Sequence, residues 1–225
     1  MPAGEVNINT SANLQALYHL SNTTDSSANG YTLTNNNTVT FPDGKFGKGA
    51  NFVAASSQSL TATLTNANVS TSQTWLMWYY ARGTGGDEFP MGFRTNGGSD
   101  YKGIQIQDGV EQRVAFYGGT TLTPNNINAP NNTLIKNRWV CVIGVYDSSA
   151  NTIKLFIDGV LQSRSTTTGT FQTATASFGL GRWGAHTVGY FNGMLDECAI
   201  WTRAWSDREV KNYYAWARGQ RGGTV

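Results

Sequence analysis

The stretch from Arg138 to Leu161, RWVCVIGVYDSSANTIKLFIDGVL, contains the clearest structural signals in the chain. Its first half is apolar at consecutive positions, so a strand here must be covered on both faces, as at the centre of two stacked sheets. Asp158-Gly159, and Asp108-Gly109 in a similar segment, each predict a two-residue hairpin turn. Comparable runs recur along the chain between Gly, Asn, Asp and Ser and lack a helical period. The sequence therefore predicts an all-β, two-layer antiparallel β-sandwich.

One short helix interrupts this pattern near the C-terminus, in WSDREVKNYYAWARG. Ser206 suits the N-cap, Glu209 completes a capping box, and Gly219 is expected just beyond the last turn. The helix is expected to seal one end of the sandwich through its apolar side chains, which are Val210, Tyr213, Tyr214 and Trp216.

The composition excludes several classes of protein. The 225 residues contain 16 Lys plus Arg against 14 Asp plus Glu, and charged residues make up 13% of the chain, about half the usual share of roughly 25%. The basic residues are scattered singly, which excludes a nucleic-acid partner. No apolar run approaches the roughly 18–20 residues of a membrane span, so no membrane insertion is expected. A hydrophobic content of 39% is sufficient for a buried core.

The chain shows no linker, repeat or break in composition, which predicts one domain over residues 13–218. Residues 1–12 read as a polar lead-in and residues 219–225 as a Gly-rich tail. The first 20 residues lack a basic start followed by an apolar stretch, so no secretory signal is visible and synthesis in a cytosol is expected. The alternative is an extracellular domain whose signal was removed. Cys141 and Cys198 lie in apolar runs and are expected to be buried free thiols.

Four stretches fall in a family order: LQALYHLSNTTDSSANG (14–30), DGKFGKGANFVAASSQSL (43–60), the stretch quoted first (138–161) and YFNGMLDECAIWTRAWSDREVKNYY (190–214). Together they resemble the laminin-G-like jelly rolls of the concanavalin A-like lectin and glucanase superfamily. The last stretch is the most specific, since it combines a Phe-Asn-Gly turn, an Asp-Glu step, a strand ending in Trp and a capped helix. The resemblance implies two curved antiparallel sheets, a concave face and loops clustered along its rim.

The chain lacks the catalytic pattern of the glucanases in this superfamily. Those enzymes carry Glu-x-Asp-x-x-Glu on one strand, whose alternate positions direct two carboxyls at one sugar linkage. Asp196 and Glu197 are adjacent and are expected to point to opposite faces. No glutamate is followed by Asp two residues later, as shown by Glu5, Glu88, Glu111, Glu197 and Glu209. The sequence therefore predicts that the domain is not an enzyme, with a glycoside hydrolase as a remote alternative.

The resemblance also implies a calcium site. In the family, the loop that reads here Asp25-Ser-Ser-Ala-Asn29-Gly30 lies beside the strand that carries Asp196, and calcium accepts six to eight oxygen ligands in loose geometry. The candidate ligands are Asp25, Asn29 and Asp196. The same letters recur from Asp147 to Asn151, where an Asx-type turn explains them. The alternative for Asp25 is therefore a turn without an ion.

Two Gly-rich loops, RTNGGSDYKG (94–103) and GRWGAHTVGY (181–190), offer the aromatic and planar polar groups that bind sugars. Trp183 is flanked by glycines and is expected either to project from its turn or to fold back over the sheet edge. The candidate ligand-binding residues are Arg94, Asn96, Asp100, Tyr101, Arg182, Trp183, His186 and Tyr190.

These features predict a non-catalytic, lectin-like module that binds glycans through its rim loops. The lack of a signal and the Asn-, Thr- and Gly-rich composition suggest an adhesion or decoration protein on a phage virion surface. The alternative is a structural protein that contacts protein neighbours, either as a homo-oligomer or together with virion capsid or tail proteins.

Overall fold

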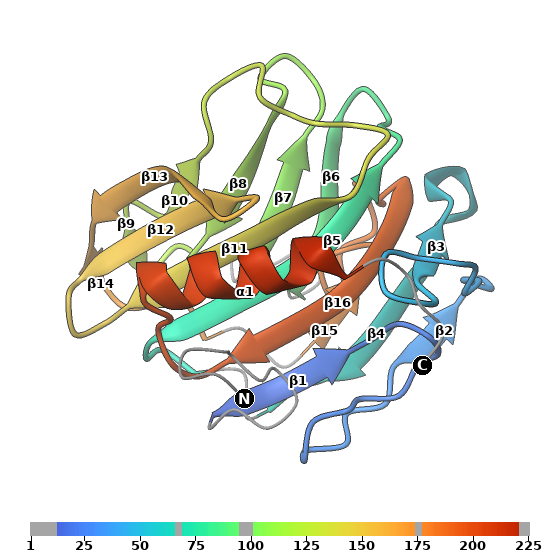
Figure 1. The fold of residues 1–225 in the computed structure, drawn as a ribbon, viewed down its shortest axis with the longest axis horizontal. Helices are drawn as coiled ribbons and strands as arrows, with labels where there is room; N and C mark the ends of the chain where they lie inside the picture. The colour runs from blue at the N-terminus through green and yellow to red at the C-terminus, as the bar shows by residue number, and fades with distance from the viewer. Residues whose placement is uncertain (1–12, 66–68, 95–100, 174–176, 221–225) are drawn as a thin grey trace.

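In the part of the chain that the structure describes, two large β-sheets face each other and one α-helix covers one of them (Figure 1). The computed structural model describes residues 13–65, 69–94, 101–173 and 177–220. Sheet A has seven strands, in the order β1 (Leu14–Tyr18), β16 (Gly193–Trp201), β5 (Gln73–Ala81), β11 (Val140–Asp147), β12 (Thr152–Ile157) and β13 (Val160–Thr166), with β3 (Ala50–Phe52) paired to β16. Sheet B has seven strands, in the order β10 (Asn126–Asn128), β8 (Arg113–Tyr117), β7 (Tyr101–Gln107), β6 (Asp87–Arg94), β15 (Ser177–Leu180), β4 (Ser59–Thr63) and β2 (Thr34–Asn36).

All pairings between the described strands are antiparallel. A small two-stranded sheet joins β9 (Leu122–Thr123) to β14 (Thr168–Gly169), and a single 3-10 turn, η1, spans Ala54–Ser56. The predicted two-layer antiparallel sandwich with one C-terminal helix is confirmed.

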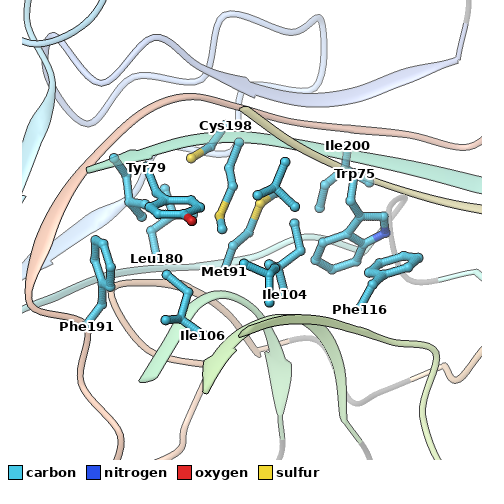
Figure 2. Close-up of a cluster of buried hydrophobic side chains, with 14 of the residues drawn as sticks. Trp75, Tyr79, Met91, Ile104, Ile106, Phe116, Leu180, Phe191, Cys198 and Ile200 are labelled. Carbon is cyan, nitrogen blue, oxygen red and sulfur yellow. The ribbon is translucent and has the colours of Figure 1, made fainter. Parts of the chain in front are cut away.

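The main core lies between the two sheets. Along β5, Trp75, Met77 and Tyr79 face sheet B, while Leu76 and Trp78 face the opposite side. Figure 2 shows how side chains of both sheets interdigitate in this layer. Each large apolar side chain buried in this way stabilises the fold by roughly 1.5–3 kcal/mol. The consecutive apolar residues of β5 thus pack in two separate apolar layers, one on each face of sheet A.

Helix α1 (Asp207–Gly219) provides the second apolar environment, because it crosses the outer face of sheet A in front of β11 and β5 (Figure 1). The expected capping box of Ser206 and Glu209 is present. Trp78 Nε1 donates to the Tyr213 hydroxyl over 3.0 Å and ties the helix to β5.

Two details of the helix prediction are wrong. The helix covers a face of the sandwich and does not seal an end, because its buried positions, Val210, Tyr213 and Ala217, form one stripe against sheet A. Trp216 lies beside that stripe and is 42% exposed. In addition, Gly219 is the last helical residue and does not follow the last turn.

One of the two predicted hairpin turns is confirmed and the other is wrong. Asp158 and Gly159 form a two-residue turn between Ile157 and Val160, and both have positive φ angles, as the turn requires. The prediction at Asp108 is wrong, because five residues separate the paired ends of β7 and β8. Asp108 is held elsewhere: its carboxylate accepts from Gly85 N at 2.8 Å and from Lys136 Nζ at 2.7 Å.

Both cysteines are buried free thiols, as predicted. Among the described residues, no helix has the length and apolar character needed to cross a membrane.

Candidate functional site

The outer face of sheet B, turned away from the core, carries a pocket of about 240 Å³. The strand alternation explains its position: Phe93, Ile104 and Phe116 face the core, so the alternating residues of β6, β7 and β8 point outward. The pocket is lined by Phe89, Arg94, Tyr101, Gln105, Tyr117 and Trp183. Three of these six residues, Arg94, Tyr101 and Trp183, are among the predicted ligand-binding residues.

Trp183 forms a wall of the pocket and is only 1% exposed. Its indole lies over Gly92 and Gly103, where a Cβ atom at Gly92 would come within 2.6 Å of the ring. Nε1 donates to the backbone oxygen of Ile104 at 2.9 Å. The ring therefore folds back onto the sheet, and the alternative of a ring that projects from its turn is wrong. Glycines at two neighbouring strand positions leave the space that the indole fills.

The second Gly-rich loop meets Arg94 and Tyr101, which flank the undescribed part of the first, at this pocket. Ala185 N donates to the backbone oxygen of Arg94 at 3.1 Å, and His186 N donates to that of Trp183 at 2.8 Å. The Arg94 guanidinium lies 5.6 Å from the centre of the Tyr101 ring, in cation–π contact. Tyr101 in turn stacks on Trp183, with ring centres 5.7 Å apart.

The other predicted residues lie beside the pocket or outside the described structure. Arg182 donates to the His186 backbone oxygen at 3.2 Å and lies 5.8 Å from the Tyr190 ring. The His186 ring packs edge-on against Phe89, a residue of the pocket wall. The remaining two candidates, Asn96 and Asp100, lie outside the described residues.

Three lining residues were missed by the sequence analysis: Phe89, Gln105 and Tyr117. Alternation along β7 places Gln105 on the same face as Tyr101, and this signal was visible in the sequence. Tyr117 joins them because it pairs with Gly103 in the β7–β8 register. The register between β7 and β8 depends on their five-residue connection. The two-residue turn predicted at Asp108-Gly109 did not anticipate this connection.

A β-bulge in β16 places two acidic side chains on the outer face of sheet A. Glu197 has a φ angle of 47°, and its carboxylate is 2.6 Å from His19 Nδ1. The Asp196 carboxylate accepts from the backbone of Phe46, whose ring packs on the same side against Trp78. The expectation of opposite faces is therefore wrong, because the bulge inserts an extra residue into the alternation.

Both of these carboxyls are buried. Asp196 is fully buried, and burial raises its pKa to about 7, with a further rise from the charge of Glu197. The hydrogen bond to Glu197 raises the pKa of His19. Neither Asp196 nor Glu197 lines the pocket. Their contacts are those of a hydrogen-bonded structural cluster.

The residues predicted to bind calcium do not fit the ion. Both oxygens of Asp25 are occupied: Oδ1 accepts from Leu17 N and Ser27 N, and Oδ2 accepts from Ser27 Oγ and Tyr31 N. These four bonds use about all the lone-pair sites of a carboxylate. The Asn29 amide nitrogen donates to the Gln15 backbone oxygen at 2.9 Å.

Asp196 is similarly occupied. Its carboxylate accepts three backbone N–H groups, from Lys45, Phe46 and Glu197, at 2.8–2.9 Å. In the described part of the chain, no group of three or more His, Cys, Asp or Glu residues could hold a metal ion. The contacts of Asp25 resemble those of Asp147, whose carboxylate accepts from the backbone of its own turn.

We therefore expect that a chelator leaves the thermal unfolding midpoint unchanged. A bound ion at 100 times its Kd would add about 2.7 kcal/mol of stability, which corresponds to about 5–11 °C in a protein of this size. Differential scanning calorimetry with EDTA and with calcium chloride measures this, and magnesium chloride controls for ionic strength. A rise of 5 °C or more with calcium alone would show that the site binds the ion.

Solved structures share this architecture. Domain 4 of AbnA, a GH43 extracellular arabinanase from Geobacillus stearothermophilus, in complex with arabinotriose, has a TM-score of 0.69 and 22% identity, over 91% of this chain and 100% of that chain. The binding domain of Paraclostridial Mosquitocidal Protein 1 has a TM-score of 0.70 and 16% identity, over 90% of this chain and 52% of that chain.

The binding domain of botulinum neurotoxin DC, in complex with SialylT, has a TM-score of 0.67 and 14% identity, over 94% of this chain and 52% of that chain. The chain thus spans about half the length of the two toxin domains. At these identities the likenesses establish a shared fold.

The sequence itself matches a family model. No match was found among curated proteins. The model described as the concanavalin A-like lectin/glucanases superfamily matches residues 54–211, which are more than two thirds of the chain. The matched segment runs from the turn before β4 into helix α1 and includes every strand that lines the pocket. The chain therefore belongs to the concanavalin A-like lectin/glucanase superfamily.

Proposed function

We propose that this domain is a non-catalytic carbohydrate-binding module and that the pocket on sheet B holds a sugar. The observation that carries the proposal is the lining itself, in which aromatic side chains surround a guanidinium and an amide. Sugars present apolar C–H faces and hydroxyl groups, which match aromatic rings and planar polar groups respectively. The pocket volume of about 240 Å³ suits one sugar ring and not a long chain.

The polar groups of the pocket are held in place before any ligand binds. Gln105 Oε1 accepts from the Gln107 amide at 3.3 Å, and Gln107 Oε1 accepts from Arg113 Nε at 2.6 Å. This chain of hydrogen bonds fixes the amide of Gln105 at the pocket wall. Preorganised polar groups lose less conformational entropy on binding, which favours affinity.

The lining argues against hydrolysis. A glycosidase of the usual kind needs two carboxyl groups that flank the scissile bond. None of the six lining residues is acidic. The assignment as a binding module is also supported by the relatives in fold, since domain 4 of the arabinanase was solved with arabinotriose and the neurotoxin domain with SialylT.

We expect Tyr117→Ala to weaken sugar binding at least tenfold, because it removes an aromatic wall of the pocket. Hot-spot aromatics commonly account for losses of this size. A glycan array followed by titration calorimetry on the best ligand measures the change. Trp216→Ala is the matched control, since it removes an aromatic side chain that is 42% exposed. Trp216 lies on α1, which packs against sheet A, whereas the pocket lies on sheet B. Equal affinity of wild type and Tyr117→Ala would remove the pocket from the proposal.

The alternative function, a structural protein in a larger assembly, makes a different prediction. The six lining residues form a pocket within a single chain, so the binding module is compatible with a monomer. Sedimentation analysis should show a monomer that still binds sugar, whereas the structural alternative predicts a stable homo-oligomer or a stable complex with capsid or tail proteins. Display on a virion surface is the setting proposed from the composition, and detection of the protein on purified particles would test it.

A further inference from the structure

We infer that the pocket selects acidic sugars, with the carboxylate of a uronic or sialic acid residue bound by Arg94. This inference rests on the proposed sugar-binding function and specifies its ligand class. It starts from the positive charge at one end of the pocket, which no protein group neutralises among the described residues.

Arg94 is the charged residue of the pocket lining. Its Nε atom is buried and has no hydrogen-bond partner. In the described structure the guanidinium makes a cation–π contact with Tyr101, and the side chain is partly exposed where it lines the pocket, so a ligand would reach its terminal Nη groups. A guanidinium binds a carboxylate through two parallel N–H···O bonds, a geometry that a hydroxyl group cannot match.

Arg182 adds a second positive charge to the same region. It belongs to no ion pair among the described residues, and its Nε atom is also buried without a partner. Burial and the charges of Arg94 and Arg182 lower the pKa of His186. Both guanidiniums therefore lie within electrostatic range of one imidazole, which packs against Phe89 of the pocket wall.

The acidic residues on the described strands of sheet B, Asp87 and Glu88, both lie at the opposite end of β6. Asp87 pairs with Gln107 and Arg94 pairs with Tyr101, so the two ends of the strand are about 20 Å apart. Asp87 is hydrogen-bonded to Gln105. The pocket is thus positive at the Arg94 end and negative beyond Gln105, which orients an acidic sugar with its carboxylate toward Arg94.

The test uses an array of matched glycan pairs, in which the carboxylate of a sialic or uronic acid is either intact or reduced to the alcohol. A third set carries sulfate in place of the carboxylate. The proteins are the wild type, Arg94→Gln, Arg94→Lys, Tyr117→Ala and Arg164→Gln. Arg164→Gln is the charge control, because Arg164 is exposed on the edge strand β13 of sheet A.

We expect the wild type to bind intact members about 10–100-fold more tightly than reduced ones, the size of a charge-assisted hydrogen-bonded pair. Arg94→Gln should abolish this preference, Arg94→Lys should keep part of it, and Arg164→Gln should leave it unchanged. A preference that persists in Arg94→Gln, or a response to sulfate alone, would overturn the inference. Equal binding of both members that is lost in Tyr117→Ala would also overturn it but would leave the proposed function intact. Absence of binding to every glycan would overturn both.

Discussion

Replacing Trp183 with alanine is expected to lower the free energy of unfolding by about 3–5 kcal/mol, the usual cost of removing a fully buried large aromatic side chain. The indole is 1% exposed and fills the space above two glycines. It contacts the rings of Phe89, Tyr101 and Tyr117 at 4.7–5.7 Å between ring centres. Its loss leaves a cavity on sheet B and removes the hydrogen bond to Ile104. Chemical denaturation monitored by circular dichroism measures the change.

The same substitution should also abolish sugar binding, because the pocket loses a wall. Binding has to be measured below the unfolding midpoint of the variant, so that the loss reports on the pocket and not on unfolding. Trp216→Ala removes a half-exposed tryptophan and is expected to cost less than about 1 kcal/mol. A loss for Trp183→Ala as small as that of the control would contradict the position of the indole.

Replacing Lys102 with methionine is expected to stabilise the protein by up to about 5 kcal/mol at pH 7 and below. Lys102 is fully buried, with Nζ 5.1 Å from the Phe93 ring centre and 5.2 Å from that of Phe171. Nζ donates to the Val69 backbone oxygen at 3.4 Å. Burial lowers the pKa of the amine from 10.5 to about 7, and each pKa unit corresponds to about 1.4 kcal/mol. Methionine fills a similar volume without a charge.

The direction in which stability changes with pH follows from the lowered pKa of Lys102. Because the folded-state pKa of Lys102 lies below the unfolded value, the unfolded chain binds the extra proton between pH 7 and pH 10.5. The contribution of Lys102 to the stability of the wild type therefore rises with pH across this window, and the penalty is complete below pH 7. The advantage of Lys102→Met should be largest at pH 7 and below and should shrink toward pH 10.

Two buried carboxyl groups, those of Glu88 and Asp196, lower the stability of the folded state as the pH rises, which is opposite to the effect of Lys102. Burial raises the pKa of Glu88 and of Asp196 to about 7, so their ionisation weakens the folded state as the pH rises toward and past 7. Both residues are present in the wild type and in Lys102→Met, and their contributions cancel in the difference between the two proteins. A difference that does not change between pH 6 and pH 10 would contradict the assigned protonation of Lys102.

The strands and the helix could be predicted because their signals are local. Consecutive apolar residues in Val140–Asp147 require cover on both faces, and the structure provides it from sheet B on one side and from α1 on the other. The capping box of Ser206 and Glu209 lies within one helical turn. Asp158 and Gly159 have the positive φ angles that their turn requires, and the Asp158 carboxylate also accepts from Cys141 N at 2.9 Å.

Local signals failed where a distant segment competes for the same residue. Asp108 precedes a glycine as Asp158 does, but its carboxylate binds Gly85 and Lys136 from other loops, and the turn becomes longer. Asp196 and Glu197 share a face because β16 contains a bulge. The alternation of a regular strand cannot predict a bulge.

The candidate site was predicted in part for the same reason. The two Gly-rich loops were identified by composition, and three of the candidate residues, Arg94, Tyr101 and Trp183, line the pocket. Whether the indole would project or fold back was open, because the space for it depends on Gly92 and Gly103 in other strands. Phe89 and Tyr117 joined the site only through the pairing of three strands.

The short apolar runs, the Asp158-Gly159 turn signal and the helix cap specify the elements of this protein, since each is read from neighbours within a few residues. The pocket depends on contacts such as the hydrogen bond from Trp183 to Ile104, whose partners are 79 positions apart in the chain. The register between such segments is set by the packing of the whole sandwich, and no short stretch of sequence encodes it.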